Sequence, residues 1–151
     1  MPTRRDSLQH AALVASLLAT SGLLPRLAHA DRPQSAFDAK TLPEVLKALG
    51  AAAPVESKAV SIVGPDIAED GSAVTVTISS SAPGVKQMLL LIEKNPNLLS
   101  AVFEPGPMVE PAFITRVKMA QSSNVYAVAI LGDGKVLFAA REIRITLGAC
   151  G

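Results

Sequence analysis

The sequence predicts an all-β protein, an immunoglobulin-like antiparallel β-sandwich of about seven strands with a short N-terminal helix and a flexible C-terminal arm. Three observations lead to this class. From Val55 onward, apolar residues recur at every second position in short segments. Turns rich in glycine, proline and asparagine separate these segments at intervals of roughly ten residues, as in a sandwich. The last four residues, Gly148-Ala149-Cys150-Gly151, carry too little side chain to anchor a core.

Residues 1–30 have the features of a twin-arginine export signal. The pair Arg4-Arg5 precedes an apolar run over residues 11–24, and Ala28-His29-Ala30 fits a small-x-small cleavage site. The run is too short to span a bilayer. We therefore expect a mature chain that begins near Asp31, lies in the periplasm and does not enter a membrane. The expected sandwich domain covers residues 31–147, and the expected arm covers residues 148–151.

Residues 31–53 contain the one stretch with a helical pattern. Thr41 and Glu44 have the spacing of a capping box, Pro43 is allowed in the first turn, and Gly50 supplies a stop. The residues that share an apolar face are Val45, Leu46 and Leu49. Because the helix is short, it must pack on another part of the protein to persist.

The rest of the domain shows strand patterns. Alternation is strict in residues 73–79, whereas the continuous apolar run of residues 88–92 predicts a strand that is buried on both faces. Residues 104–111 hold three prolines and one glycine and predict a loop, and Gly132-Asp133-Gly134 predicts a hairpin turn. The expected strands are residues 57–63, 73–79, 85–93, 98–103, 113–119, 125–131 and 136–147.

Composition excludes several classes of function. The chain has a formal charge of +1; removing residues 1–30 takes away three of the 14 basic and one of the 13 acidic residues and leaves −1. This balance lacks the basic footprint of a nucleic-acid binder. Both histidines, His10 and His29, lie in the expected signal, so the domain has no Ser-His or Cys-His pair and no ordinary zinc or copper site. We expect no catalytic residues, no metal and no cofactor.

The single cysteine, Cys150, is the candidate functional residue. An arm of four extended residues reaches about 13 Å, so we expect an exposed thiol. Three interpretations compete: covalent attachment of a small sulfur compound, an intermolecular disulfide in a secreted interaction module, or the nucleophile of a peroxidase or sulfurtransferase. The third is the weakest, because an enzyme thiol needs its pKa lowered by a nearby cation or imidazole, and the carboxylate of Gly151 acts the other way.

Several short segments, in their order along the chain, resemble the SoxY family, the sulfur-carrier subunit of the periplasmic thiosulfate-oxidation (Sox) system. The cysteine tail and the twin-arginine leader add to this resemblance. The segments are Ile92-Glu93-Lys94-Asn95-Pro96, Phe103-Glu104-Pro105, Thr115-Arg116-Val117-Lys118-Met119, Gly132-Asp133-Gly134-Lys135 and Arg141-Glu142-Ile143-Arg144-Ile145-Thr146.

The resemblance implies a carrier rather than an enzyme. It makes Cys150 the covalent attachment residue for thiosulfate-derived sulfur and makes Gly148, Ala149 and Gly151 the arm. It implies a SoxZ-type β-sandwich partner in a heterodimer. A c-type cytochrome would load the thiol, a hydrolase would release sulfate, and a molybdenum sulfur dehydrogenase, where present, would oxidise the remaining sulfur. The family tail is Gly-Gly-Cys-Gly-Gly, so Ala149 replaces a glycine and the tail is one residue shorter.

Overall fold

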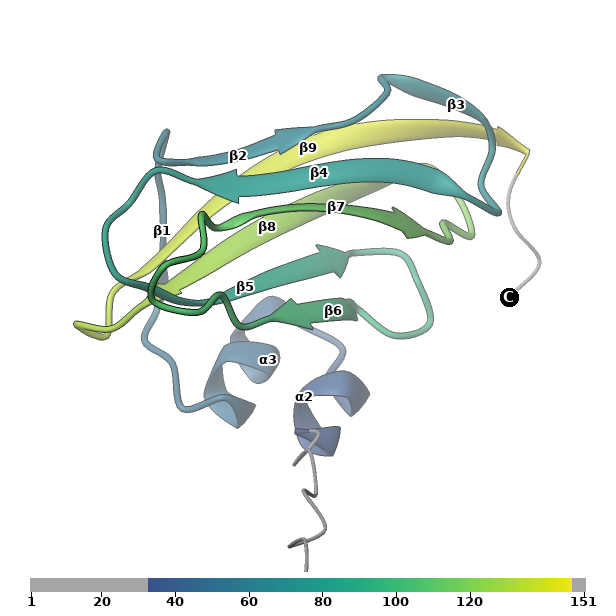
Figure 1. Ribbon diagram of the computed structural model, residues 1–151. Helices are drawn as coiled ribbons and strands as arrows, with labels where there is room; N and C mark the ends of the chain where they lie inside the picture. The colour runs from purple at the N-terminus through teal and green to yellow at the C-terminus, as the bar shows by residue number, and fades with distance from the viewer. Residues whose placement is uncertain (1–32, 148–151) are drawn as a thin grey trace, which may run out of the picture. The chain divides into compact units, whose positions relative to one another are not determined.

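The computed structural model describes residues 33–147 of the chain (Figure 1). The predicted signal and the predicted arm therefore lie outside the described residues. Within them, the chain forms two short helices and nine strands. The helices are α2 (Gln34–Asp38) and α3 (Leu42–Ala48). The strands are β1 (Pro54–Glu56), β2 (Val60–Val63), β3 (Ile67–Asp70), β4 (Val74–Ser80), β5 (Val85–Ile92), β6 (Leu99–Phe103), β7 (Ala112–Val117), β8 (Ser123–Leu131) and β9 (Val136–Leu147).

The strands form two sheets. The larger has the order β1-β9-β8-β5-β6, with β3 also paired to β9, and the smaller has the order β2-β4-β7. Neighbouring strands are antiparallel except at β9, which pairs in parallel with β1 at its start and with β3 at its end. The fold is thus the predicted all-β sandwich. The short strands β1 and β3 extend the larger sheet along one edge of β9, β1 beside its first half and β3 beside its second half.

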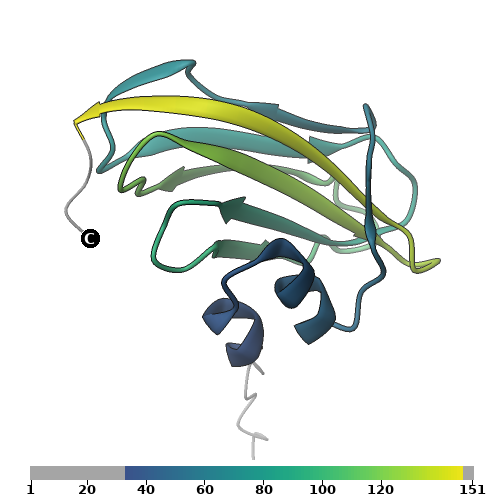
Figure 2. The same cartoon turned by 180° about the vertical axis from the view of Figure 1, so that it is seen from behind.

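The larger sheet is the middle of three layers (Figures 1 and 2). One face packs against the small sheet, and Met88, Leu90 and Ile92 contribute to that core. The opposite face packs against the helices, and Leu89 and Leu91 contribute there. All five of these β5 side chains are fully buried. This arrangement confirms the prediction of a strand buried on both faces and explains why its sequence lacks alternation.

The helix prediction is confirmed at α3. The Glu44 N–H donates to Oγ1 of Thr41 at 3.4 Å, and the Thr41 N–H donates to Oε2 of Glu44 at 3.2 Å, which completes the capping box. Gly50, just past the end, has a φ of +67°, which costs glycine little. Val45 and Leu46 are buried against the sheet, so tertiary packing stabilises this two-turn helix.

Three elements were not predicted. The strand expected over residues 57–63 begins only at Val60, because the chain turns after Ser57, where the Val60 N–H donates to the Ser57 carbonyl at 3.2 Å, and the unpredicted β1 lies before that turn. β1 then joins the large sheet and β2 joins the small one. Helix α2 has only five residues, too few for a periodic pattern. Strand β3 has the burial pattern of a surface edge, with no alternation to reveal it.

Candidate functional site

The last strand, β9, leads toward the residues that the sequence selected. It ends at Leu147, which is 70% exposed. The predicted attachment residue Cys150 and the predicted arm residues Gly148, Ala149 and Gly151 lie outside the described residues. The described part of the candidate site is therefore the end of β9 together with the segments that hold it.

Strand β3 and the turn after it hold one edge of this end. β3 runs parallel to β9, and the register places Asp70 opposite Leu147. The Gly71 N–H donates to the Leu147 carbonyl at 2.8 Å, so the backbone is paired as far as the last described residue. One residue earlier, the Thr146 hydroxyl donates to the Glu69 carbonyl at 2.8 Å.

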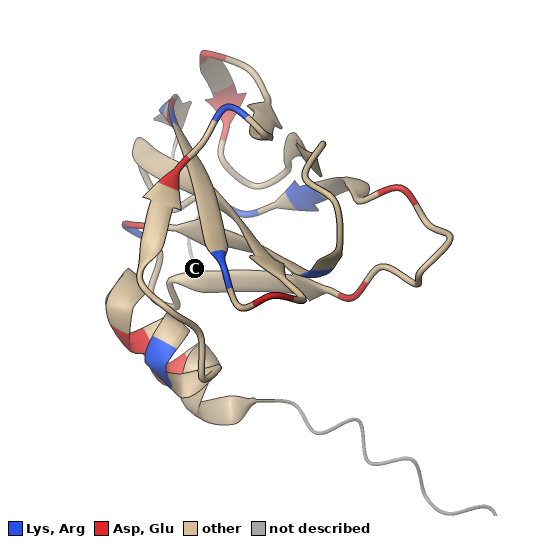
Figure 3. Cartoon of the chain, turned by 90° about the vertical axis from the view of Figure 1, so that its left-hand side faces the viewer, with Lys and Arg blue, Asp and Glu red and all other residues tan. Residues whose placement is uncertain are grey.

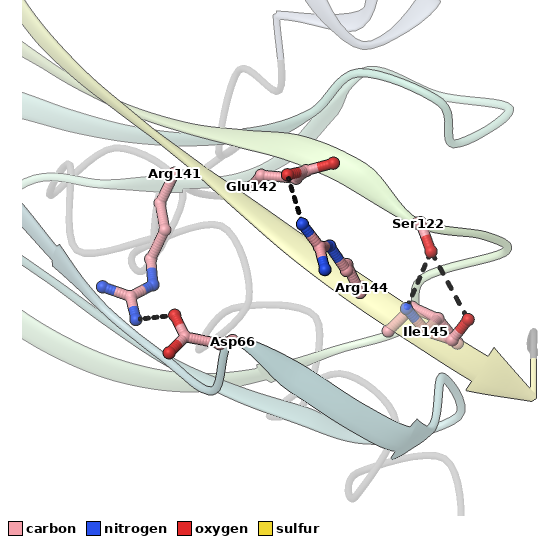
Figure 4. A network of polar contacts seen from close by, with 6 residues as sticks. All are labelled: Asp66, Ser122, Arg141, Glu142, Arg144 and Ile145. Carbon is pink, nitrogen blue, oxygen red and sulfur yellow. Dashed lines mark hydrogen bonds and ion pairs between the residues drawn. The ribbon is translucent and has the colours of Figure 1, made fainter.

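Ser122 holds the other edge, beyond the point where β8 stops pairing. The last paired residues of the β8–β9 ladder are Ser123 and Ile143. Two positions further along β9, the Ile145 N–H donates to Oγ of Ser122 at 2.9 Å, and the Ser122 hydroxyl donates to the Ile145 carbonyl at 3.4 Å (Figure 4). One side chain just before the start of β8 thus replaces a strand neighbour, and the end of β9 is bonded on both sides.

An ion pair joins β9 to the segment that leads into β3. Nη2 of Arg141 lies 2.6 Å from Oδ1 of Asp66 (Figure 4). The Arg144 N–H also donates to the Asp66 carbonyl at 3.0 Å. The Arg141 side chain is 35% exposed, and its Nε is buried with no hydrogen-bond partner among the described residues. Asp66 therefore ties the two segments together through both its side chain and its backbone.

The charges beside β9 are mixed. Arg144 and Glu142 lie on the same strand with a separation of 3.8 Å between Nη2 and Oε2, and with Asp66 and Ile67 they line a depression of about 210 Å³. Because cations and anions share this depression, it does not favour an anionic ligand. The cartoon in Figure 3 likewise shows basic and acidic residues interspersed over the visible elements.

Asp70 is a charged group directly opposite the last described residue. The backbone N–H of Ser72 donates to Oδ1 at 2.8 Å, and the Ser72 hydroxyl donates to Oδ2 at 2.7 Å. These bonds stabilise the carboxylate and lower the pKa of Asp70 below its ordinary value. The turn that pairs with Leu147 therefore holds a negative charge at neutral pH.

The basic residues of the segments that resemble SoxY differ in exposure. Arg116, Lys118 and Arg144 are exposed, whereas Arg141 is half-buried and paired. Three methionines also differ in exposure: Met88 and Met119 are fully buried, whereas Met108 is 97% exposed.

Sequence reasoning missed Asp66 and Ser122. Asp66 follows a Gly-Pro pair and looks like part of a linker, and Ser122 looks like an ordinary turn residue. Neither has a local pattern, because each acts on β9 from a distant part of the chain.

The described residues offer little chemistry of their own. Residues 33–147 contain no histidine or cysteine, and no group of acidic residues within them could hold a metal ion. The two helices of this part of the chain are too short and too polar to cross a membrane. What this part of the chain provides is a rigid strand end.

Comparison with known proteins identifies the fold and the family. The family model described as "Sulfur oxidation protein SoxY" matches residues 45–150, which is more than half of the chain. The chain belongs to the SoxY family. The match begins in helix α3, covers every strand and includes Cys150.

Solved structures agree with this assignment. The sulfur carrier protein SoxY from Chlorobium limicola f. thiosulfatophilum is 31% identical, with a TM-score of 0.63; the similarity covers 70% of this chain and 94% of that chain. A variant of the superoxide reductase (neelaredoxin) from Ignicoccus hospitalis has a TM-score of 0.52 at 18% identity, over 57% of this chain and 78% of that chain. The second similarity shows a shared fold alone. Among curated protein sequences, none matches this chain.

Proposed function

We propose that this chain is a periplasmic sulfur carrier that holds thiosulfate-derived sulfur covalently on Cys150 and presents it to sulfur-oxidising enzymes. The observation that carries the proposal is the match to the SoxY family, which extends through residue 150. The similarity to a sulfur carrier over nearly the whole length of that protein supports the same role. The proposed arm consists of Gly148, Ala149 and Gly151.

The way β9 ends supports this role. Cys150 is three residues beyond Leu147, so the thiol can reach about 10 Å from the end of the strand. Hydrogen bonds from Gly71 and Ser122 hold that end on both edges. A carrier benefits from such an arrangement, because the arm that bears the thiol then always starts from the same fixed point on the domain.

The chemistry requires partner enzymes. In the loading step, the Cys150 thiolate and thiosulfate form an S–S bond and give up two electrons, which a c-type cytochrome accepts. In the next step, water attacks the outer sulfonate, which leaves as sulfate with two protons while a persulfide anion stays on Cys150. A hydrolase would catalyse this release, and a molybdenum sulfur dehydrogenase would oxidise the remaining sulfur.

We further propose that the chain is not an enzyme and that it works as a heterodimer with a SoxZ-type β-sandwich subunit. The family is one of carriers, which supports the first point, and it implies a partner from the Sox system, which supports the second. The carrier would need no cofactor beyond the covalently bound sulfur. Export by residues 1–30 through the twin-arginine route would bring it to the periplasm.

Intact mass spectrometry of unreduced protein tests the proposal. We expect chain isolated from thiosulfate-oxidising cells to carry thiosulfate-derived mass adducts that a thiol reductant removes. The same chain from cells grown without thiosulfate is the matched control, and the Cys150→Ser variant should carry no adduct under either condition. A bare thiol in every sample would refute the carrier role. Clean disulfide-linked dimers without small adducts would instead indicate an interaction module.

A further inference from the structure

A small cavity lies where the helix layer of the sandwich ends. The helices cover only part of the outer face of the large sheet (Figures 1 and 2). Along this face of β8, Val128 is fully buried in the core shared with the helices, Tyr126 is half-buried and Asn124 is exposed. Beside Tyr126, a cavity of about 260 Å³ separates the sheet from the first turn of α3. The cavity therefore opens at the boundary between the covered and the uncovered part of the sheet.

Two aromatic rings line this cavity. Tyr126 on β8 and Phe138 on β9 have ring centroids 6.4 Å apart and ring planes at 50° to each other. Both residues are half-buried, so part of each remains accessible to a small molecule. The face of an aromatic ring carries partial negative charge and attracts cations. Aromatic rings grouped around one small volume are the usual binding site of quaternary ammonium groups.

The remaining walls are apolar. Leu42 contributes from the first turn of α3, and Leu98, which is 4% exposed, contributes from the segment before β6. Such walls suit methyl groups, whereas a bare ammonium ion would lose its water shell here without gaining hydrogen bonds. The volume lies just below the range of about 300–1,000 Å³ of pockets for larger ligands, so it suits an ion of a few heavy atoms.

Glu93 supplies a negative charge at the edge of the cavity. Oε2 of Glu93 accepts from Nδ2 of Asn124 at 3.0 Å, and Oε1 has no hydrogen-bond partner from residues 33–147. Burial and, after it, the negative charge of Glu93 raise the pKa of the Tyr126 hydroxyl above its ordinary value. The carboxylate is therefore near enough to act electrostatically on this ring, and one of its oxygens is available to a ligand.

Lys40 also lines the cavity, but its ammonium group is held elsewhere. Nζ of Lys40 donates to the Pro96 carbonyl at 2.7 Å. The ion pairs formed within residues 33–147 do not include one between Lys40 and Glu93. The charge of Glu93 is thus not neutralised at contact distance. Lys40 still repels an entering cation, so its removal should strengthen cation binding.

We propose that this cavity binds a small quaternary ammonium ion, whose methyl groups contact Tyr126 and Phe138 and whose charge lies beside Glu93. Binding is reversible and involves no covalent step. The ring faces and the carboxylate both act against an anion. The proposal does not depend on sulfur carriage.

The chain contains its own reporter for this site. Tyr126 is the only tyrosine and the chain has no tryptophan, so tyrosine fluorescence reports on the cavity. Titration of the full chain with tetramethylammonium chloride, at an ionic strength held constant with sodium chloride, should give a saturable change with a dissociation constant on the order of 1 mM. Choline should bind similarly. Its neutral analogue, in which a tert-butyl group replaces the trimethylammonium group, should bind at least about ten-fold more weakly.

Four variants keep the reporter and test the parts of the site. Glu93→Gln keeps the shape of the side chain but removes its charge, and Phe138→Leu removes one ring, so each should raise the dissociation constant by about three-fold or more. Lys40→Gln should lower it. Glu110→Gln is the matched control, because it makes the same change as Glu93→Gln at an exposed residue that does not line the cavity, and it should leave the constant unaltered. Thermal unfolding shows whether each variant is folded.

Three results would overturn the proposal. The first is the absence of a saturable change up to about 100 mM tetramethylammonium. The second is equal binding of the neutral analogue, which would show a merely apolar cavity. The third is a dissociation constant that Glu93→Gln does not alter.

Vesicles identify the source of the bound group. Co-sedimentation of the chain with phosphatidylcholine vesicles, reversed by tetramethylammonium, would support the proposal with a lipid headgroup as the ligand. Binding of the free ions without co-sedimentation would support it with a soluble ligand.

Discussion

Ser122 shows how a single side chain can extend a sheet by one position. The β8–β9 ladder reaches no further than Ser123 and Ile143, and the Ser122 hydroxyl supplies the donor and the acceptor that Ile145 would otherwise lack. An amide left without a partner in a partly buried position costs more than the hydrogen bond gains on average. On the β8 side, one oxygen atom therefore holds Ile145 at the strand end.

Replacing Ser122 with alanine tests this contact. We expect Ser122→Ala to lower the free energy of unfolding by about 1–2 kcal/mol, because the Ile145 N–H loses its acceptor. Ser81→Ala is the matched control, since its exposed hydroxyl makes only one long bond of 3.4 Å, and it should change stability by less than about 0.5 kcal/mol. Urea denaturation measures both. Equal losses for the two variants would show that the bond contributes nothing specific.

Residue-scale contacts of this kind could not be predicted from the sequence. Strand alternation says which side of a sheet Arg141 occupies but not which distant residue pairs with it. The chain brings Asp66 to it across 75 positions, and the arginine becomes half-buried. The choice of Cys150 as the candidate functional residue, in contrast, followed from its being the only thiol, and the resemblance to SoxY then implied the attachment role.

At the scale of elements, the β8–β9 hairpin is the connection that the sequence predicted most directly. Gly132-Asp133-Gly134 closes it, and the Gly134 N–H donates to the Leu131 carbonyl at 3.0 Å. Gly134 has a φ of +89°, a conformation that other residues rarely adopt. Gly132 does not share this conformation. Within this one turn, the backbone conformation therefore favours glycine at position 134 but not at position 132.

Alanine substitutions distinguish the two positions. Gly134→Ala should lower the free energy of unfolding by about 1–2 kcal/mol, although open space surrounds the position, because the cost lies in the backbone conformation. Gly132→Ala places its methyl group 3.6 Å from the nearest atom, an ordinary contact, and should cost less than about 0.5 kcal/mol. Thermal unfolding followed by circular dichroism checks both. A larger loss at Gly132 would contradict the assignment.

Elements with a local signature were predicted, and elements without one were not. The capping box revealed α3, and strict alternation revealed β4, within one residue of its observed bounds. β3 is exposed and short, and it exists because β9 lies beside it, 77 positions away along the chain. No property of its four residues alone specifies that pairing.

At the scale of the whole molecule, the structure has three layers rather than two. The larger sheet is enclosed between the small sheet and the helices, so Leu89 and Leu90 point to different cores although they are neighbours. The sequence predicted a strand buried on both faces but did not say what covers the second face. The covering residues lie in residues 36–49, far along the chain from β5, and no local pattern in either segment shows that the two pack together.

Truncation of these two leucines tests the layered arrangement. Leu89→Ala and Leu90→Ala should each lower the free energy of unfolding by about 3 kcal/mol, because both side chains are fully buried. Val63→Ala removes carbon atoms from a 63% exposed side chain and should cost less than about 1 kcal/mol. Guanidinium denaturation measures all three. A small loss at Leu89 alone would show that the helices do not cover the sheet in solution.

The parallel pairing of β3 with β9 determines how the domain responds to mechanical load. Hydrogen bonds between strands lie across the strand direction, so tension applied at Leu147 along β9 shears many of them at once, on the β8 side and on the β3 side together. Peeling the strand away would break them one after another and would need less force. A force that a bound protein applies to the C-terminal end of β9 along the strand is therefore resisted by many hydrogen bonds together, and the sandwich stays folded.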